Sequence, residues 1–444
     1  MNEDGLDLRP PRSFSDVSNR LEDAGFEAWA VGGAVRDRFL GVDRDDWDLA
    51  TSARPNQVVD LFRRTVPLGI EHGTVGVLDP DGVLYEVTTF RKDVETDGRH
   101  AVVEFAETIE DDLARRDFTI NAIAWRERTG ELRDPWDGRS DLEARVLRAV
   151  GEPAERFAED YLRVLRGLRF AGVYGLAIDP PTREALEEAV NDLGQLSAER
   201  VREELVKVLA APEPSATLQL YRDTGALGVW YPELELHANE AAWDEALAAI
   251  DELNRYRGHL RLCRLLLVIP TQPSSEPEAE PGFAAASTVL KRLKFSSAEQ
   301  RRALHLYQHF LPFISPVDSA ADIREWLHQI GPGNERDLFR LHFAAARAAR
   351  ADDAIRALVF VWRRAHDERL SGAPIERGDL AVDGNDVLSL GMPGGPLVGL
   401  LLDELHARVL EDPDLNTRYQ LLEQARELID MAGLADASPE PEAE

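Results

Sequence analysis

Two aspartates separated by one residue are the first residues in this chain whose types and spacing could do chemistry. Asp46-Trp47-Asp48 has a strand-like context, in which Asp46 and Asp48 project from one face. Two carboxylates so placed can jointly hold two divalent ions about 3.5–4 Å apart. One ion would acidify an attacking hydroxyl, and the other would hold a triphosphate and its leaving pyrophosphate. Alone, an Asp-x-Asp in so acidic a chain is typical of solvated surface, so its neighbours decide the interpretation.

Two neighbouring features could complete such a site. Upstream, Gly32-Gly33 follows a short apolar strand and begins a helix, which lets backbone N–H groups approach phosphate oxygens. Downstream, Glu86 lies in the strand pattern Tyr85-Glu86-Val87, either as an outward-facing acid or as a third acid beside the metals. The order of glycine turn, helix, Asp-x-Asp and apolar-acid-apolar strand resembles that of the nucleotidyltransferase superfamily, which includes DNA polymerase β.

Arg116 and Asp117 offer groups suited to the rest of a ribonucleotide. The cation could bind a triphosphate, and the carboxylate could accept a hydrogen bond from a ribose 2′-OH. Asn121 could add a phosphate or ribose contact. An ion pair at a helix end is the structural alternative for Arg116 and Asp117.

Asp160 and Arg163 could read a base. We expect them at i, i+3 on a helix, where a surface ion pair is the plain alternative. Asp160 could accept from the exocyclic amino group of cytosine or adenine while Arg163 donates to the ring nitrogen. Guanine and uracil present a carbonyl and a ring N–H there, so both contacts would become repulsive. Because each three-residue step turns a helix by about 60°, we expect Arg166 near a triphosphate and Arg169 more peripheral.

The elements that must position these residues are of mixed α/β type in the first ~150 residues. The pattern predicts a helix through Phe14, Val17 and Leu21 that ends at Gly25, and a second helix that Gly41 closes. Strands are predicted at 28–31, 47–51, 74–78 and 83–89, the last two joined by a turn at 79–82. From about Glu152 onward the pattern is helical.

Composition fits an ordinary globular chain of 444 residues, with 44% hydrophobic and 30% charged residues. No apolar run reaches the ~18 residues of a membrane span, and the acidic N-terminus lacks the apolar stretch of a signal peptide. The single cysteine, Cys263, excludes an internal disulfide framework and a cysteine-based zinc site. We therefore expect a cytoplasmic protein.

The charge is the unusual part of the composition. The formal net charge is −31, and only four of the 51 basic residues are lysines. Such a chain should be repelled by nucleic acid at long range, so any RNA contact must come from local arginine clusters. The acidic excess suggests a surface suited to high internal salt, where repulsion is screened within about 3 Å at 1 M.

Five motifs in unbroken order over about residues 28–210 resemble those of class II CCA-adding enzymes and bacterial poly(A) polymerases. Residues 383–428, with Pro393-Gly394-Gly395-Pro396 and Asn416, resemble the C-terminal region of that family. The motif segments are Gly32-Gly33-Ala34-Val35-Arg36-Asp37 with Asp46-Trp47-Asp48-Leu49-Ala50-Thr51, Arg115-Arg116-Asp117-Phe118-Thr119-Ile120-Asn121-Ala122, Asp134-Pro135-Trp136-Asp137-Gly138 with Asp141-Leu142, Glu159-Asp160-Tyr161-Leu162-Arg163, and Glu199-Arg200.

This resemblance implies an α+β fold, with a polymerase β-like head containing a small mixed sheet, followed by an all-helical neck, body and tail. It implies addition of the 3′-terminal CCA to tRNA from CTP and ATP, with Mg²⁺ held by Asp46 and Asp48 and assisted by Glu86. The implied nucleotide-binding residues are Gly32, Gly33, Arg36, Arg116, Asp117, Asn121, Asp160, Arg163, Arg166 and Arg169. The expected domains are a head at 1–150, a neck at 151–212, a body at 213–370 with a flexible insertion at 271–282, a tRNA-binding tail at 371–434, and a disordered end at 435–444.

Three alternatives stay open on the sequence. An A-adding enzyme or a poly(A) polymerase would share the head motifs. Leu68-Gly69-Ile70-Glu71-His72-Gly73-Thr74-Val75 and the expected flexible loop at 92–100 resemble full CCA-adding enzymes instead. His366-Asp367 could belong to a metal phosphohydrolase site, but it has no supporting histidine cluster nearby. A non-catalytic tRNA-binding protein is the alternative from a different class. The oligomeric state is not predicted.

Overall fold

The structure is a computed structural model that describes residues 8–42, 46–70, 73–96, 101–270, 280–310 and 319–433. The chain divides into two compact units, Met1–Leu236 with Arg292–Lys294, and His237–Lys291 with Phe295–Glu444. Of the sequence predictions, Glu71 and His72, the insertion at 271–279 and the end at 435–444 lie outside the described residues.

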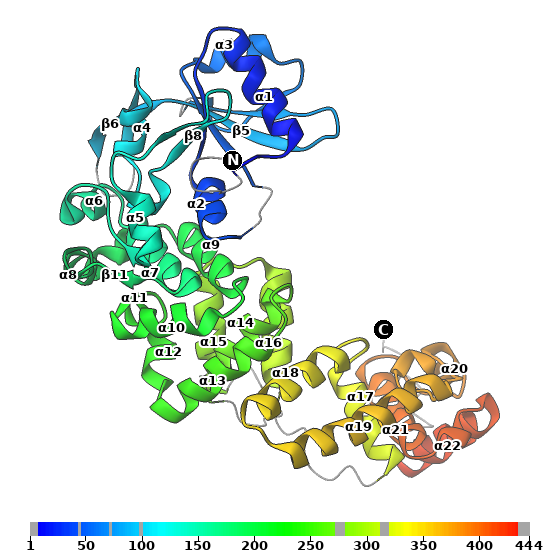
Figure 1. Cartoon of the computed structure of the whole chain (residues 1–444). Coiled ribbons are helices and arrows are strands. Elements are labelled where there is room, and N and C mark those ends of the chain that lie inside the picture. The colour runs from blue at the N-terminus through cyan, green and yellow to red at the C-terminus, as the bar shows by residue number, and fades with distance from the viewer. Residues whose placement is uncertain are drawn as a thin grey trace, which may run out of the picture. The chain divides into compact units, whose positions relative to one another are not determined.

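The N-terminal part of the first unit contains a mixed sheet and short helices (Figure 1). Its helices are α1 (Arg12–Asp23), α2 (Gly33–Phe39), α3 (Pro55–Leu61), α4 (Ile109–Ala114) and α5 (Gly138–Glu143), with a 3₁₀ turn, η2, at Thr119–Asn121. Its strands are β1 (Ala28–Val31), β2 (Asp48–Thr51), β3 (Thr65–Pro67), β4 (Thr74–Leu78), β5 (Leu84–Thr89), β6 (Arg91–Thr96), β7 (Ala101–Phe105), β8 (Ala124–Arg126) and β9 (Glu131–Arg133).

Within the described residues, the main sheet has the order β3-β4-β5-β2-β1-β8-β9. β2 and β5 run parallel, with Leu49 opposite Val87, and the other neighbouring strands are antiparallel. This register places Asp48 and Glu86 on adjacent strands, each directly before a member of that pair. The predicted small mixed sheet is therefore confirmed, and it brings two acids that are far apart in sequence next to each other.

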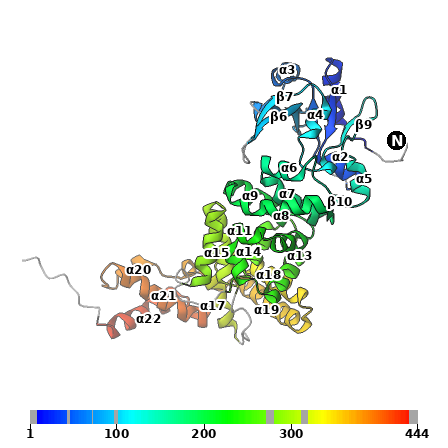
Figure 2. The same ribbon diagram turned by 90° about the vertical axis from the view of Figure 1, so that its left-hand side faces the viewer.

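The apolar pattern explains why these elements form. Phe14, Val17 and Leu21 are buried on one face of α1, and Phe14 packs on Trp47 and Tyr85. All four residues of β1 are buried because the strand lies inside the sheet. Figures 1 and 2 show α1 beside α3 and α2 beside α5, in agreement with the contacts between these helices.

Helices dominate the rest of the first unit, as predicted, with one addition. The helices are α6 (Pro153–Glu159), α7 (Leu162–Tyr174), α8 (Pro180–Ala189), α9 (Ala198–Leu209), α10 (Pro214–Asp223), α11 (Ala226–Trp230) and α12 (Pro232–His237). The addition is a short parallel pairing of β10 (Val146–Leu147) with β11 (Ala177–Ile178). The predicted all-helical neck is wrong at this point, because two residues are too few to give a strand signal in the sequence.

The second unit is helical throughout its described residues. Its helices are α13 (Glu240–Glu252), α14 (Gly258–Leu266), α15 (Pro281–Arg292), α16 (Ser297–Gln308), α17 (Ala320–Ile330), α18 (Glu335–Ala348), α19 (Asp352–Ser371), α20 (Gly384–Leu388), α21 (Pro396–Glu411) and α22 (Arg418–Met431). α20, α21 and α22 share a small apolar core built on Val387, Leu405 and Leu421.

The predicted flexible loop at 92–100 is partly wrong. Its first residues belong to β6, which pairs antiparallel with β7. Residues 97–100 lie outside the described residues. The charged sequence of this segment hid the strand, because cross-strand pairing depends on the partner rather than on local propensity alone.

Candidate active site

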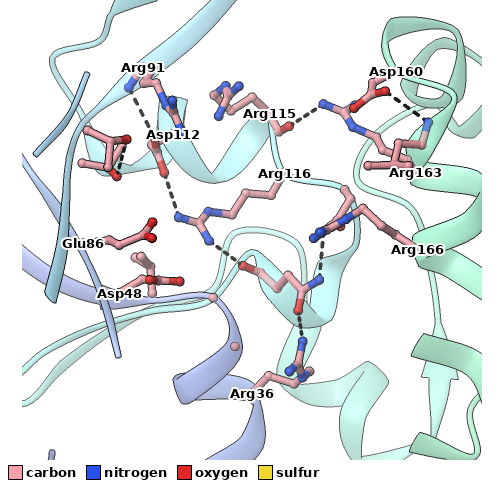
Figure 3. Close-up of a pocket in the computed structure, with 18 of the residues that line it drawn as sticks. Arg36, Asp48, Glu86, Arg91, Asp112, Arg115, Arg116, Asp160, Arg163 and Arg166 are labelled. Carbon is pink, nitrogen blue, oxygen red and sulfur yellow. Dashed lines mark hydrogen bonds and ion pairs between the residues drawn. The ribbon is translucent and has the colours of Figure 1, made fainter. Parts of the chain in front are cut away.

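A cavity of about 490 Å³ lies in the first unit. It is lined by residues from the turn before α2, from β2 and β5, from the segment between α4 and η2, and from α7 and the residues around it. Figure 3 shows the carboxylates Asp48 and Glu86 at one end and Asp160 and Arg163 at the other. Acids and cations from separate stretches of sequence thus face one space.

Asp48 and Glu86 form the acidic end of the cavity. Burial, Glu86 and Asp46 together raise the pKa of Asp48 to about 6, with Arg116 acting in the opposite sense. Asp46 is exposed and lies just before β2, outside the cavity lining. A divalent cation bound here would offset the repulsion between these carboxylates.

The donor set fits Mg²⁺ on this ground. Among the described residues, no three His, Cys, Asp or Glu side chains converge closely enough to hold an ion by themselves. Proteins bind Mg²⁺ through one or two carboxylates, and substrate phosphates and water supply the remaining ligands. Two carboxylates at one end of the cavity therefore match the number of ligands that a protein supplies.

Gly32 closes one wall beside the acids. Its φ of 72° is in the left-handed region, which favours glycine, and it directly precedes α2. A Cβ at this position would lie 3.1 Å from Arg116 Nη1 and 3.8 Å from Asp48 Oδ2. Any side chain would therefore intrude between the cation and the carboxylate. Gly33 also lines the cavity.

Arg116 lies between the two ends of the cavity (Figure 3). Its Nη2 donates to Asp112 Oδ2 at 3.1 Å, and its Nη1 donates to the carbonyl oxygen of Asn121 at 3.3 Å. The other oxygen of Asp112 accepts from the Arg91 backbone N–H at 3.3 Å. The helix-end ion pair between Arg116 and Asp117 does not occur, because each has a different partner.

Asp117 is buried and fully engaged. Its Oδ1 accepts from the Phe118 N–H and from Asn121 Nδ2, both at 2.9 Å, and its Oδ2 accepts from Arg166 Nε and Nη2, both at 2.7 Å. Burial would raise the pKa of Asp117, but Arg166 and the hydrogen bonds hold it well below its usual range. A ribose hydroxyl would have to displace one of these donors, since a carboxylate has about four acceptor positions.

Arg36 lines the cavity but is almost fully buried, with 4% of its surface exposed. It donates to Asn121 Oδ1 at 2.6 Å, to Asp37 Oδ1 at 2.7 Å and to Tyr174 Oη at 2.6 Å. Its guanidinium lies 4.5 Å from the centre of the Tyr174 ring and 5.0 Å from that of Phe170. Through Asn121 it supports Asp117, and through Asp117 it supports Arg166.

Asp160 and Arg163 line the cavity, but their local structure differs from the prediction. Asp160 follows α6 with an extended backbone, so it is not part of the helix that carries Arg163. Asp160 Oδ2 accepts from Arg200 Nη2 at 2.7 Å, and its Oδ1 accepts from the Leu162 N–H at 3.1 Å. The expected alternative of an ion pair between Asp160 and Arg163 is therefore wrong.

Arg163 has its own partners on the head and on α6. It donates to the backbone oxygens of Arg156 at 3.0 Å and Arg115 at 3.1 Å, and it pairs with Glu159. These bonds fix the guanidinium at the end of the cavity opposite the acids (Figure 3). The base-reading hypothesis requires this fixed orientation.

Arg166 and Arg169 differ in their relation to the cavity. Arg166 lines the cavity, whereas Arg169 is not among its lining residues and donates to Glu204 Oε2 at 2.6 Å. Four charged lining residues were not predicted as site residues from the sequence, namely Arg91, Asp112, Arg115 and Arg200. Arg115 and Arg200 stood inside recognised motifs and could have been found there, whereas nothing in the sequence marked Arg91 or Asp112.

Comparison with known proteins agrees with this geometry. Residues 28–148 match the poly(A) polymerase head domain, and residues 175–237 match a domain described as the probable RNA and SrmB-binding site of polymerase A. The chain is 33% identical over 411 residues to the CCA-adding enzyme of Lactobacillus gasseri, covering 92% of this chain and 95% of that one. The chain belongs to the CCA-adding enzyme family.

Other relatives also match this chain over most of its length. The CCA-adding enzyme of Anoxybacillus flavithermus is 34% identical over 428 residues, which cover 93% of this chain and 96% of that one. The crystal structure of the Bacillus stearothermophilus CCA-adding enzyme in complex with CTP is similar with a TM-score of 0.76 and 29% identity, covering 96% of this chain and 99% of that chain. Among the described residues, no helix combines the length and apolar character needed to cross a bilayer.

Proposed function

We propose that this chain adds the 3′-terminal CCA to tRNA from CTP and ATP without a nucleic acid template. Membership of the CCA-adding enzyme family supports this, and the observation that carries it is the single cavity with Asp48 and Glu86 at one end and Asp160 and Arg163 at the other. Chemistry at one end and base selection at the other are what such an enzyme needs.

The residues divide the work of nucleotidyl transfer. Asp48 and Glu86, assisted by Asp46, would hold Mg²⁺, which acidifies the attacking hydroxyl and neutralises phosphate charge when bound. Arg116 and Arg166 orient the triphosphate, each held in place by a buried carboxylate. The tRNA 3′-oxygen bonds to the α-phosphorus, the bond from that phosphorus to the β-phosphate oxygen breaks, and pyrophosphate leaves.

Base selection is assigned to Asp160 and Arg163. Asp160 accepts from the amino group of cytosine or adenine, and Arg163 donates to the ring nitrogen. Arg200 holds the Asp160 carboxylate, so it keeps the acceptor from turning away. Exchanging the two residues, as Asp160→Arg with Arg163→Asp, should admit UTP or GTP; an unchanged choice of nucleotide would refute the assignment.

One assay separates the proposed function from its alternatives. Transcripts of tRNA that end before CCA, after C or after CC are incubated with single nucleotides and Mg²⁺. A CCA-adding enzyme incorporates C, C and A in turn and stops. Incorporation of A alone after CC indicates an A-adding enzyme, and unlimited A addition to any RNA indicates a poly(A) polymerase.

A variant pair separates an enzyme from a non-catalytic tRNA-binding protein. Asp48→Asn should lower kcat by about a hundredfold or more while tRNA affinity is kept, because the lost carboxylate holds the metal. Glu143→Gln is the matched control, since its carboxylate is 67% exposed and pairs with Arg139 on α5, outside the cavity. If neither variant changes turnover, the carboxylate assignment is wrong.

A further inference from the structure

One face of α18 in the second unit carries a stripe of arginines. Arg336, Arg340, Arg347 and Arg350 follow at intervals of four, seven and three residues, with Phe343 between them, so they lie along one side of the helix and its C-terminal end. The stripe is about 20 Å long at the rise of an α-helix. Arg336, Arg347 and Arg350 are exposed, and Arg340 is partly buried.

Two arginines of this stripe, Arg340 and Arg347, line a cavity of about 470 Å³. The opposite wall is the end of α13 and the segment that leads into α14, including Asn254 and Arg257. The apolar residues that line the cavity are Leu253, Phe343 and Ala344. Arginines therefore line this cavity on two sides, together with Glu252, which pairs with Arg347.

A buried carboxylate, that of Asp337, holds some of these arginine side chains in place. The side chain of Asp337 is 7% exposed and contacts His259 at 3.2 Å and Arg340 at 2.8 Å, as well as Arg302 and, at 4.0 Å, Arg257. Burial would raise the pKa of Asp337, but hydrogen bonds from His259, Arg302 and Arg340 hold it well below its usual range. One carboxylate therefore gathers three guanidinium groups.

The charges at this place do not balance. Arg347 reaches Glu252 at 3.7 Å, whereas Arg336 and Arg350 have no ion pair with any residue that the structure describes. A network that served stability alone would be expected to pair its cations, since nearby like charges cost free energy. A local excess of positive charge is unexpected in a chain of net charge −31.

Aromatic rings accompany the cations. Tyr256 is 80% exposed next to Arg257, and the Arg255 guanidinium lies 4.9 Å from the centre of its ring. Arginines interleaved with exposed aromatic rings are typical of surfaces that bind the phosphates and bases of RNA.

We propose that this arginine surface, formed by Arg257, Arg336, Arg340, Arg347 and Arg350, binds successive phosphates of the tRNA backbone. The inference rests on the proposed function, because tRNA is the polyanion that function supplies. The surface belongs to the second unit, whereas the residues that line the catalytic cavity all belong to the first. Local arginines thereby overcome the repulsion that the whole chain exerts on RNA.

The test compares the double variant Arg336→Ala/Arg347→Ala with the single variant Arg356→Ala. Arg356 is the matched control because its side chain is 71% exposed and lies on the neighbouring helix α19, outside the surface. Binding of labelled tRNA lacking CCA is measured with the full chain at several KCl concentrations. We expect the double variant to weaken binding about tenfold and to lower the slope of log Kd against log salt by about 1 for each phosphate that an arginine no longer neutralises.

Kinetics provide a readout that a general loss of folding would not give. The double variant should raise the KM for tRNA and leave the KM for CTP and the thermal unfolding temperature unchanged. Arg347→Lys should keep most of the affinity, because the charge remains. Equal tRNA affinity and salt slope in the double variant, in Arg356→Ala and in the wild type would overturn the inference.

The outcomes also separate this inference from the proposed function. If the wild type adds no nucleotide to any tRNA, the proposed function fails. If it adds CCA normally but the double variant binds and reacts like the wild type, only the arginine surface is refuted. The same holds if the double variant keeps its tRNA affinity and instead loses binding to an acidic polypeptide such as polyglutamate.

Discussion

At the scale of single residues, the candidate site depends on a chain of hydrogen bonds that supports Arg166. Arg36 lies against the rings of Phe170 and Tyr174 and is linked to Asp117 through Asn121. Tyr174 accepts from Arg36 and donates to Asp37 Oδ1 at 3.0 Å, so it ties the last turn of α7 to α2. We interpret Tyr174 as a positioning residue for Arg166, the arginine that we propose orients the triphosphate.

Tyr174→Phe tests this interpretation. Loss of a hydrogen bond to a charged group, worth about 1.5 kcal/mol, should lower kcat/KM for CTP and ATP about tenfold. The KM for tRNA and the unfolding temperature should change little. Tyr419→Phe, at an exposed position on α22, is the control. A drop in unfolding temperature with unchanged nucleotide kinetics would mean that Tyr174 is only structural.

At the scale of elements, close helix contacts set the geometry of the cavity. α7 carries Arg163 and Arg166, and it packs on α10 through Gly172. A Cβ at Gly172 would lie 2.2 Å from Thr217 Oγ1 and 2.6 Å from the Thr217 backbone N. Only glycine allows the two helices to approach this closely.

Gly172→Ala should therefore destabilise the first unit. Overpacking of this kind costs about 1–3 kcal/mol, and it should also reduce the rate of nucleotide addition by shifting α7. Gly194→Ala is the matched control, because a Cβ there meets no atom within 4 Å. Equal thermal unfolding temperatures for the two variants would show that α7 and α10 can separate without cost.

The Asp337 cluster gives an element-scale prediction with a defined pH window. The folded-state pKa of Asp337 lies below its unfolded value of about 3.9, so its charge stabilises the second unit above that value. The stabilisation should be lost as the pH falls below about 4, where the unfolded chain takes up the proton first. In urea unfolding, wild type should exceed Asp337→Asn in stability at pH 7, and the difference should shrink towards pH 3. A constant difference would contradict the assignment.

At the scale of the whole molecule, the net charge of −31 opposes the approach of tRNA. Salt shortens the range of this repulsion from about 10 Å at 0.1 M to about 3 Å at 1 M, while direct contacts at an arginine surface act at shorter distances. We expect CCA addition to be retained at molar KCl. The hypothesis of a high-salt protein is rejected if the initial rate declines steadily from low salt to 1 M.

The sequence by itself identified most of the reactive residues that meet in the cavity. Asp48, Glu86, the Gly32-Gly33 turn and the motif around Arg116 all line it, because types and spacing of reactive residues are local properties, whereas Asp46 lies outside the lining. The strands β1, β2, β4 and β5 were also predicted, since alternation and turn residues are local, whereas the three-residue strands β3, β8 and β9 of the same sheet were not. The extended backbone at Asp160 and the β10–β11 pairing were missed, since both depend on neighbours distant in sequence.

Only the tertiary structure decided which groups are partners. The sequence suggested Arg116 with Asp117 and Asp160 with Arg163, whereas folding pairs Arg116 with Asp112, Asp117 with Arg166, and Asp160 with Arg200. The physical reason is that an ion pair needs oriented side chains a few ångströms apart, and residues close in sequence often point apart. The same applies to the α18 arginines, whose number is read from the sequence but whose excess over their acidic partners is a property of the folded chain.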